Sequence, residues 1–201
     1  AKGEVSLKGA WIFFYILASS CLSLLMFVPK TTVQISLVIA VFILIYPLTK
    51  RFLKAPQFFL GITFGSGTLI SYSLASPNFS ISIMILFLGT VLWIISFDTI
   101  YALEDIDDDR IIGINSTPIL WGDKAILISK ILHLLFYVSL LLIFYVNQFS
   151  LVFLAILFIL LCTYLYQYSL VNEEKYLKAF KINHWVGMFA TIGFAVEIFL
   201  I

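Results

Sequence analysis

The chain has 201 residues, of which 62% are hydrophobic and only 11% are charged. A soluble domain carries about 25% charged residues. The mean hydropathy of +1.10 therefore excludes a soluble globular protein and indicates an integral membrane protein. The net charge of +1 gives no indication of nucleic-acid binding, and we expect no nucleic-acid partner. The apolar runs are continuous rather than alternating, which favours transmembrane helices over a β-barrel.

Seven apolar segments follow one another along the chain, each near the ~20 residues that span a bilayer. They cover approximately residues 9–28, 32–46, 56–75, 80–103, 124–146, 149–171 and 180–201. The second segment is expected to stop at Pro47. The third contains Gly61, Gly65 and Gly67, a pattern typical of close helix packing, because no strand precedes it as a nucleotide loop would require. The sequence predicts one all-α transmembrane domain over residues 1–201, with seven spanning helices.

The basic residues of the loops are distributed unevenly between the two membrane sides. Lys30 alone falls on one side, and the other eleven of the twelve lie on the opposite side: Lys2, Lys8, Lys50, Arg51, Lys54, Arg110, Lys124, Lys130, Lys175, Lys178 and Lys181. Cytoplasmic loops carry the excess of Lys and Arg. We therefore expect this basic side to face the cytoplasm.

The fourth segment leads into residues 97–110, the acidic segment, which holds six of the eleven acidic residues. A carboxylate at membrane depth costs at least ~2.5 kcal/mol and marks a site of chemistry or transport. On a continuous helix, Asp98, Tyr101, Asp105 and Asp109 would lie within roughly 80° of one another. Asp105 and Asp109 are four residues apart, and Cys and His are absent nearby. Such an all-oxygen pair suits Mg²⁺.

Lys50 and Arg51 are expected on the same membrane side as the acidic segment, with Lys54 close by. They are compatible with simple headgroup contact, or with a phosphate clamp, because guanidinium and ammonium groups both bind phosphate. A charged, solvated loop is the corresponding alternative for the acidic segment. Taken together, the two clusters predict a pyrophosphate site that contains Mg²⁺.

The motif D-T-I-Y-A-L-E-D-I-D-D-D at 98–109, followed by I-G-I-N-S-T at 112–117 and L-W-G at 120–122, resembles the second Asp-rich motif of UbiA-type prenyltransferases. Within that superfamily it is most similar to the 4-hydroxybenzoate polyprenyltransferases. Residues 46–57 and 178–183 are similar to two further loops of these proteins. The resemblance implies that the seven segments correspond to helices three to nine of a nine-helix bundle around a cavity. The first Asp-rich motif, N-D-x-x-D-x-x-x-D, is absent, as expected of an N-terminally incomplete chain.

The resemblance implies transfer of a polyprenyl group from a prenyl diphosphate to an aromatic acceptor, 4-hydroxybenzoate, in ubiquinone biosynthesis. Asp105 and Asp109 would hold Mg²⁺, and Lys50 and Arg51 would bind the diphosphate. The catalytic candidates are Tyr101, which would donate to the diphosphate or line the cavity, and Asp98, which would orient Tyr101 or accept a proton.

The expected location is the bacterial inner membrane, or the mitochondrial inner membrane in a eukaryote, with the active site facing the cytoplasm and membrane lipid as a further partner. Two alternatives remain at this point. A transporter would also carry carboxylates within helices, although the outer halves of the segments are almost wholly apolar. A truncated, non-catalytic remnant of the enzyme is the other.

Overall fold

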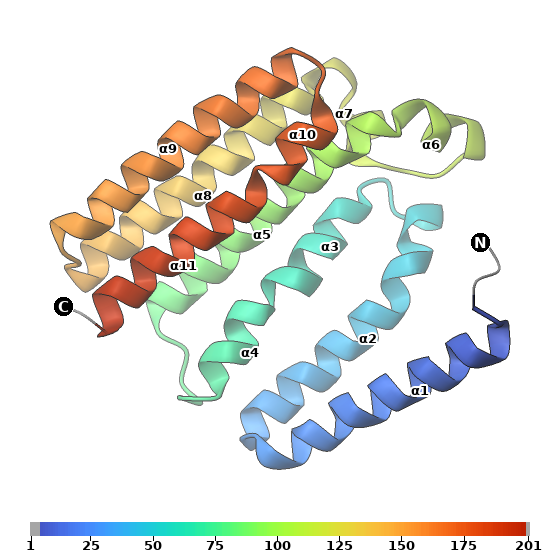
Figure 1. The fold of residues 1–201 in the computed structure, drawn as a ribbon, viewed down its shortest axis with the longest axis horizontal. Coiled ribbons are helices and arrows are strands. Elements are labelled where there is room, and N and C mark those ends of the chain that lie inside the picture. The colour runs from blue at the N-terminus through green and yellow to red at the C-terminus, as the bar shows by residue number, and fades with distance from the viewer. Residues whose placement is uncertain (1–4, 200–201) are drawn as a thin grey trace.

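The computed structural model describes residues 5–199, and within them every regular element is a helix, as predicted (Figure 1). The elements are α1 Leu7–Leu24, η1 Leu25–Phe27, α2 Lys30–Phe52, α3 Pro56–Gly65, α4 Gly67–Ser73, α5 Ile81–Glu104, α6 Ile106–Ile112, α7 Thr117–Trp121, η2 Gly122–Lys124, α8 Ala125–Asn147, α9 Leu151–Asn172, α10 Tyr176–Lys181 and α11 Asn183–Phe199.

Six stretches among the described residues are long and apolar enough to cross a membrane. They correspond to six of the seven predicted segments. The remaining segment, predicted at 56–75, forms the two shorter helices α3 and α4, which meet at Ser66. Around this junction Ser66 Oγ donates to the carbonyl of Thr63 at 2.6 Å, and Thr68 Oγ1 donates to that of Gly65 at 2.8 Å. Ser66 itself stays near helical geometry, with φ −60° and ψ −16°, so the two helices are separated by a single irregular residue rather than by a loop.

The prediction that the second segment stops at Pro47 is wrong, because α2 continues through this residue to Phe52. Proline lacks the N–H that would complete the hydrogen-bond ladder. Transmembrane helices tolerate this loss where neighbouring groups or local adjustments satisfy the freed carbonyl. The additional turn matters for the site, because it carries Lys50 and Arg51 on α2 itself rather than on a loop.

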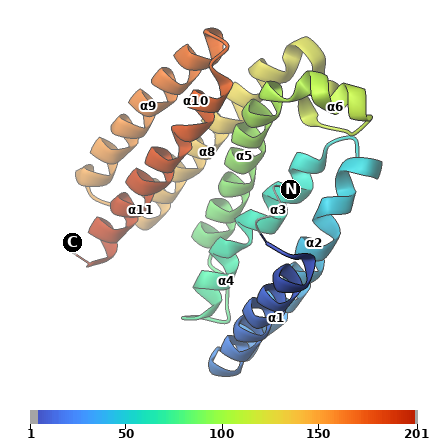
Figure 2. The same cartoon turned by 45° about the vertical axis from the view of Figure 1, so that its right-hand side comes forward.

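Helix α5 is the central element, and it packs against α8 on one side and against α3 on the other (Figures 1 and 2). A Cβ atom added to Gly61 would lie 2.9 Å from Ile95 Cγ1, and one added to Gly65 would lie 2.8 Å from Val91 Cγ2. The predicted packing role is confirmed for these two glycines. A Cβ on Gly67 would meet no atom within 4 Å, so the third glycine of the pattern does not share that role.

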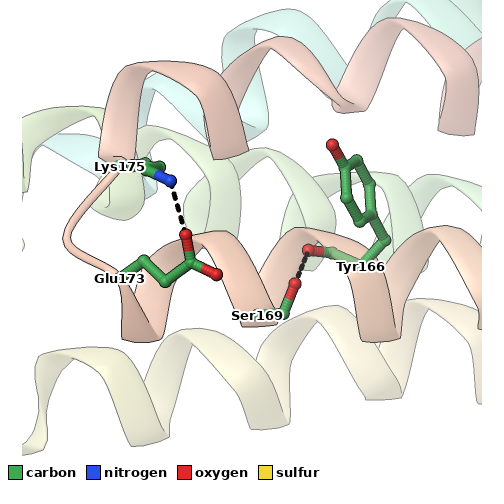
Figure 3. Close-up of polar contacts among 4 residues, drawn as sticks. All are labelled: Tyr166, Ser169, Glu173 and Lys175. Carbon is green, nitrogen blue, oxygen red and sulfur yellow. Dashed lines mark hydrogen bonds and ion pairs between the residues drawn. The ribbon is translucent and has the colours of Figure 1, made fainter.

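The α9–α10 corner lies at the same end of the bundle as α6 and α7 (Figure 2). Figure 3 shows the ion pair between Lys175 and Glu173 and the hydrogen bond from Ser169 to the carbonyl of Tyr166. Lys175 Nζ lies 2.6 Å from Glu173 Oε2. The hydrogen bond and the charge of Lys175 lower the pKa of the exposed Glu173 carboxylate below its ordinary value. Glu104, the last residue of α5, accepts a hydrogen bond from the N–H of Leu177 at 3.2 Å. The end of α5 is thereby joined to α10.

Candidate active site

A cavity of about 720 Å³ lies between α2, α3 and α4, with one carboxylate of α5 in its wall. The lining is largely apolar, and Asp98 is its one charged residue. The lining residues are Ile39, Ile43, Tyr46, Pro47, Leu60, Thr63, Phe64, Ser66, Gly67, Ile70 and Asp98. A space of this composition can accommodate an extended apolar chain whose polar head lies near the carboxylate.

Asp98 lies two turns before the end of α5, where it interacts with Lys50 of α2 and with the side chain of Gln57 of α3. Gln57 is only 1% exposed, and its Oε1 accepts the N–H of Thr117 at 3.0 Å. This contact leaves the amide NH₂ of Gln57 as the donor toward Asp98. Residues of α2 and α3 therefore lie near the Asp98 carboxylate.

The acidic segment is not the single continuous helix that the prediction assumed. Helix α5 ends at Glu104, and Asp105 has φ −107° and ψ 12° before α6 begins. Asp109 N–H still donates to the carbonyl of Asp105 at 2.9 Å, so the two aspartates lie one turn apart. Their environments differ, because Asp109 is only 6% exposed and Asp105 is exposed. The interruption at Asp105 therefore changes the direction of the chain between Asp98 and Asp109.

The two predicted metal ligands have the donor chemistry of a partial ligand set for a hard divalent cation. Both Asp105 and Asp109 supply oxygen, and their helical spacing leaves most of a coordination shell to water and phosphate, as is usual for Mg²⁺. No group of three or more acidic, His or Cys side chains that could hold a metal occurs among residues 5–199. Neither aspartate is among the residues that line the cavity. At 1.5 Å per residue, Asp105 lies about 10 Å beyond Asp98 along α5.

The basic pair and the acidic segment lie close together. The backbone carbonyl of Lys50 accepts the N–H of Asn115 at 2.9 Å and its Nδ2 at 3.3 Å. The loop between α6 and α7 is thus attached to the end of α2. The Lys50 side chain is half-buried and Arg51 is exposed, so both cations remain available to an anion at this end of the bundle.

Tyr101 does not share the cavity with Asp98. It is 40% exposed, and its ring packs against Phe180 of α10 with 4.9 Å between centroids. The predicted face is therefore divided: Asp98 is directed toward α2 and α3, and Tyr101 toward α10.

Gln57, Asn115 and Thr117 were not identified as site residues from the sequence. Gln57 and Thr117 are 60 positions apart, and Asn115 and Lys50 are 65 positions apart. Helical periodicity does not reveal contacts over such separations. Gln57 alone could have been identified from the sequence, because a glutamine in a largely apolar segment requires hydrogen-bond partners for its amide.

The described helices form a polytopic membrane protein whose acidic segment, basic pair and largely apolar cavity meet toward one end of the bundle. This arrangement defines a membrane-embedded enzyme for an amphiphilic substrate. The profile of the UbiA prenyltransferase family matches residues 1–194, and the chain belongs to this family.

Relatives and solved structures agree with this assignment. The chain is 33% identical to a 4-hydroxybenzoate octaprenyltransferase of Vesicomyosocius okutanii, over 98% of this chain and 73% of the relative. It is 34% identical to the protein of the same name from Legionella pneumophila (strain Paris), over 100% of this chain and 71% of that relative. An apo UbiA homolog from Aeropyrum pernix K1 has the same fold, with a TM-score of 0.82 and 22% identity over 97% of this chain and 74% of that chain. A digeranylgeranylglyceryl phosphate synthase has a similar fold, with a TM-score of 0.68 and 23% identity over 98% of this chain and 71% of that chain. The chain is a prenyltransferase similar to the 4-hydroxybenzoate octaprenyltransferases.

Proposed function

We propose that this protein transfers a polyprenyl group from a prenyl diphosphate to 4-hydroxybenzoate, in ubiquinone biosynthesis. The observation that carries the proposal is the cavity, which is largely apolar and has Asp98 in its wall, within electrostatic range of Lys50. The names of the relatives support the same two substrates.

The end of the bundle that carries the acidic segment and the basic pair is proposed to bind the diphosphate. Lys50 and Arg51 would neutralise its oxygens, since an ammonium and a guanidinium group both bind phosphate. Asp105 and Asp109 would hold a divalent cation, which we take to be Mg²⁺. When bound, this cation supplies charge stabilisation to the leaving diphosphate. The tether between Asn115 and the Lys50 carbonyl supports the proposal, because it keeps the basic pair beside the acidic segment.

The proposed reaction breaks the C–O bond of the prenyl diphosphate, and the diphosphate leaves with both electrons. The resulting allylic cation is attacked by the ring carbon ortho to the acceptor hydroxyl, which forms a C–C bond. Loss of the proton from that carbon restores the aromatic ring, and Asp98 is the proposed base because it lies in the cavity wall. Apolar walls exclude water, which would otherwise quench the cation. Tyr101 packs against Phe180 of α10 and does not line the cavity, so no contact with the diphosphate is proposed for it.

The membrane arrangement is also a proposal. We infer that α3 and α4 together make a seventh crossing, so that the seven spans correspond to helices three to nine of a nine-helix bundle. From Pro56 to Ser73 the two helices rise about 27 Å at 1.5 Å per residue, close to the thickness of the hydrocarbon core. The excess of basic residues at the acidic end supports a cytoplasmic orientation of the site, with the bacterial inner membrane as the location.

The metal assignment predicts the effect of two conservative substitutions. Asp105→Asn and Asp109→Asn should each abolish transfer of a labelled prenyl group to 4-hydroxybenzoate in proteoliposomes, because an amide does not supply the negative charge that holds the cation. Membrane insertion should be unchanged. EDTA should remove wild-type activity, and added Mg²⁺ should restore it.

The exposed Asp123 of η2 provides a matched control. Asp123→Asn removes a carboxylate from the loop after α7 and should leave transfer at the wild-type level. Near-normal turnover of either Asp105→Asn or Asp109→Asn would refute the metal assignment.

A further inference from the structure

The cavity is elongated parallel to the helices. Its lining covers positions 39–47 of α2 and positions 60–70 of α3 and α4. At 1.5 Å per residue, these ranges correspond to about 12 Å and about 15 Å of helix. Asp98 marks the polar end, because it interacts with Lys50 in the last turns of α2. The opposite end, near the last lining residues of α4, is apolar.

Gly67 is the one glycine among the lining residues, and its lack of a side chain is not needed for packing. A Cβ on Gly67 would meet no atom within 4 Å, whereas one on Gly61 or Gly65 would overlap Val91 or Ile95 of α5. The backbone does not require glycine either, since the described glycines with positive φ are Gly113 and Gly122. Gly67 is the first residue of α4 and is exposed. Its effect at position 67 is to leave space in the cavity wall.

We propose that Gly67 determines the length of the prenyl chain that the cavity admits. This inference rests on the proposed function, because it assigns the apolar part of the cavity to the prenyl chain. Position 67 is seven residues beyond Leu60 and three before Ile70, so it lies between the polar end and the far end of the lining. A side chain at this position would project into open space and obstruct the distal part. A short prenyl chain would end before position 67 and would be unaffected, whereas a long prenyl chain would extend past this position and would be hindered.

The test is the chain-length selectivity of Gly67→Phe in the full chain, in proteoliposomes with Mg²⁺. Binding of geranyl, farnesyl and octaprenyl diphosphates is measured by competition with a labelled octaprenyl diphosphate, and transfer to 4-hydroxybenzoate is measured in parallel. The ratio of octaprenyl to geranyl affinity should fall at least about tenfold, which corresponds to about 1.4 kcal/mol. Gly67→Ala should change the ratio in the same direction and to a smaller extent.

Val41→Phe is the matched control, because it adds the same ring to an exposed position on the face of α2 opposite the lining residues, and Val41 does not line the cavity. Its affinity ratio should remain that of the wild type. An unchanged ratio in Gly67→Phe, or an equal loss for all chain lengths, would overturn the inference. Thermal unfolding in detergent detects a general folding defect. If the wild type binds none of the three diphosphates, the proposed function itself fails, and this result is distinguishable from a wild type that binds all of them.

Discussion

Gln57 connects three parts of the candidate site through one buried amide. Its Oε1 accepts the N–H of Thr117, and its NH₂ is left as the donor toward Asp98. Thr117 also shares a 2.7 Å hydrogen bond with Thr99, the neighbour of Asp98 on α5. An amide supplies an acceptor and donors at once. A glutamine can therefore satisfy the backbone of α7 and orient a carboxylate of α5 together.

Replacement of Gln57 by leucine should destabilise the protein. The substitution keeps a side chain of similar size but leaves the buried N–H of Thr117 without an acceptor, which costs about 1–3 kcal/mol. Thermal unfolding in detergent micelles should show a lower midpoint for Gln57→Leu. Gln34 of α2 is exposed, so Gln34→Leu provides the control and should unfold as the wild type does. Equal midpoints for Gln57→Leu and Gln34→Leu would contradict the bridging role.

For single residues, the sequence identified a candidate site residue where a polar side chain interrupts an apolar run. Asp98 could be identified as a site residue from the sequence, because a carboxylate within an apolar run is energetically costly and indicates a functional role. Its partners Gln57 and Lys50 come from other helices, and a pattern within one helix contains no information about them. Tyr101 was placed beside Asp98 by periodicity, but a difference of about 60° around α5 is enough to direct the two side chains toward different neighbours.

At the scale of elements, close contact of α5 with its two neighbours depends on small residues. Gly61 and Gly65 of α3 were identified by their spacing. Gly89 of α5 was not, although a Cβ at this position would lie 1.9 Å from Ser139 Oγ of α8. A lone glycine in an apolar segment has no repeat that reveals it. Helix–helix contact in membranes relies on such residues, because lipid is as apolar as the side chains and gives little driving force for association.

Gly89→Ala should therefore destabilise the contact between α5 and α8 by about 1–3 kcal/mol, the usual cost of overpacking. The double variant Gly89→Ala/Ser139→Gly should recover part of this loss, since it removes both atoms that the new Cβ would meet closely: Ser139 Oγ at 1.9 Å and Ser139 Cβ at 2.8 Å. Unfolding midpoints of the two single variants and the double variant form a cycle that isolates the pairwise energy. Simple additivity across the cycle would count against this contact.

Element boundaries were predicted well where the apolar pattern changes abruptly and poorly where the backbone changes within an apolar or polar run. The segment predicted at 80–103 closely matches α5, Ile81–Glu104. The separation of α3 from α4 at Ser66 falls within apolar sequence, where no change in hydropathy marks it. The continuation of α2 through Pro47 was missed because the cost of a proline depends on what satisfies the freed carbonyl.

For the whole molecule, the number of membrane crossings decides which loops share a side. Six described stretches meet the criteria of length and apolar composition, and α3 with α4 is divided. The loop that contains Asn78 joins α4 to α5 and is the informative position, because it follows the divided pair directly. If the pair crosses the membrane, this loop lies on the side opposite Lys54. If it does not cross, the two loops lie on the same side.

Single cysteines at loop positions distinguish these arrangements. In a background with Cys21 and Cys162 replaced by alanine, cysteines at Lys54 and Asp123 should react with a membrane-impermeant maleimide only after the cytoplasmic face is opened. A cysteine at Asn78 should react in intact cells, because all three positions are exposed and the proposed seventh crossing, with the basic excess on the cytoplasmic side, would put Asn78 on the opposite face. Labelling of Asn78 with the same sidedness as Lys54 would exclude a seventh crossing. It would also make α3 and α4 re-entrant, so that the apolar end of the cavity would have to open within the bilayer rather than toward its far surface.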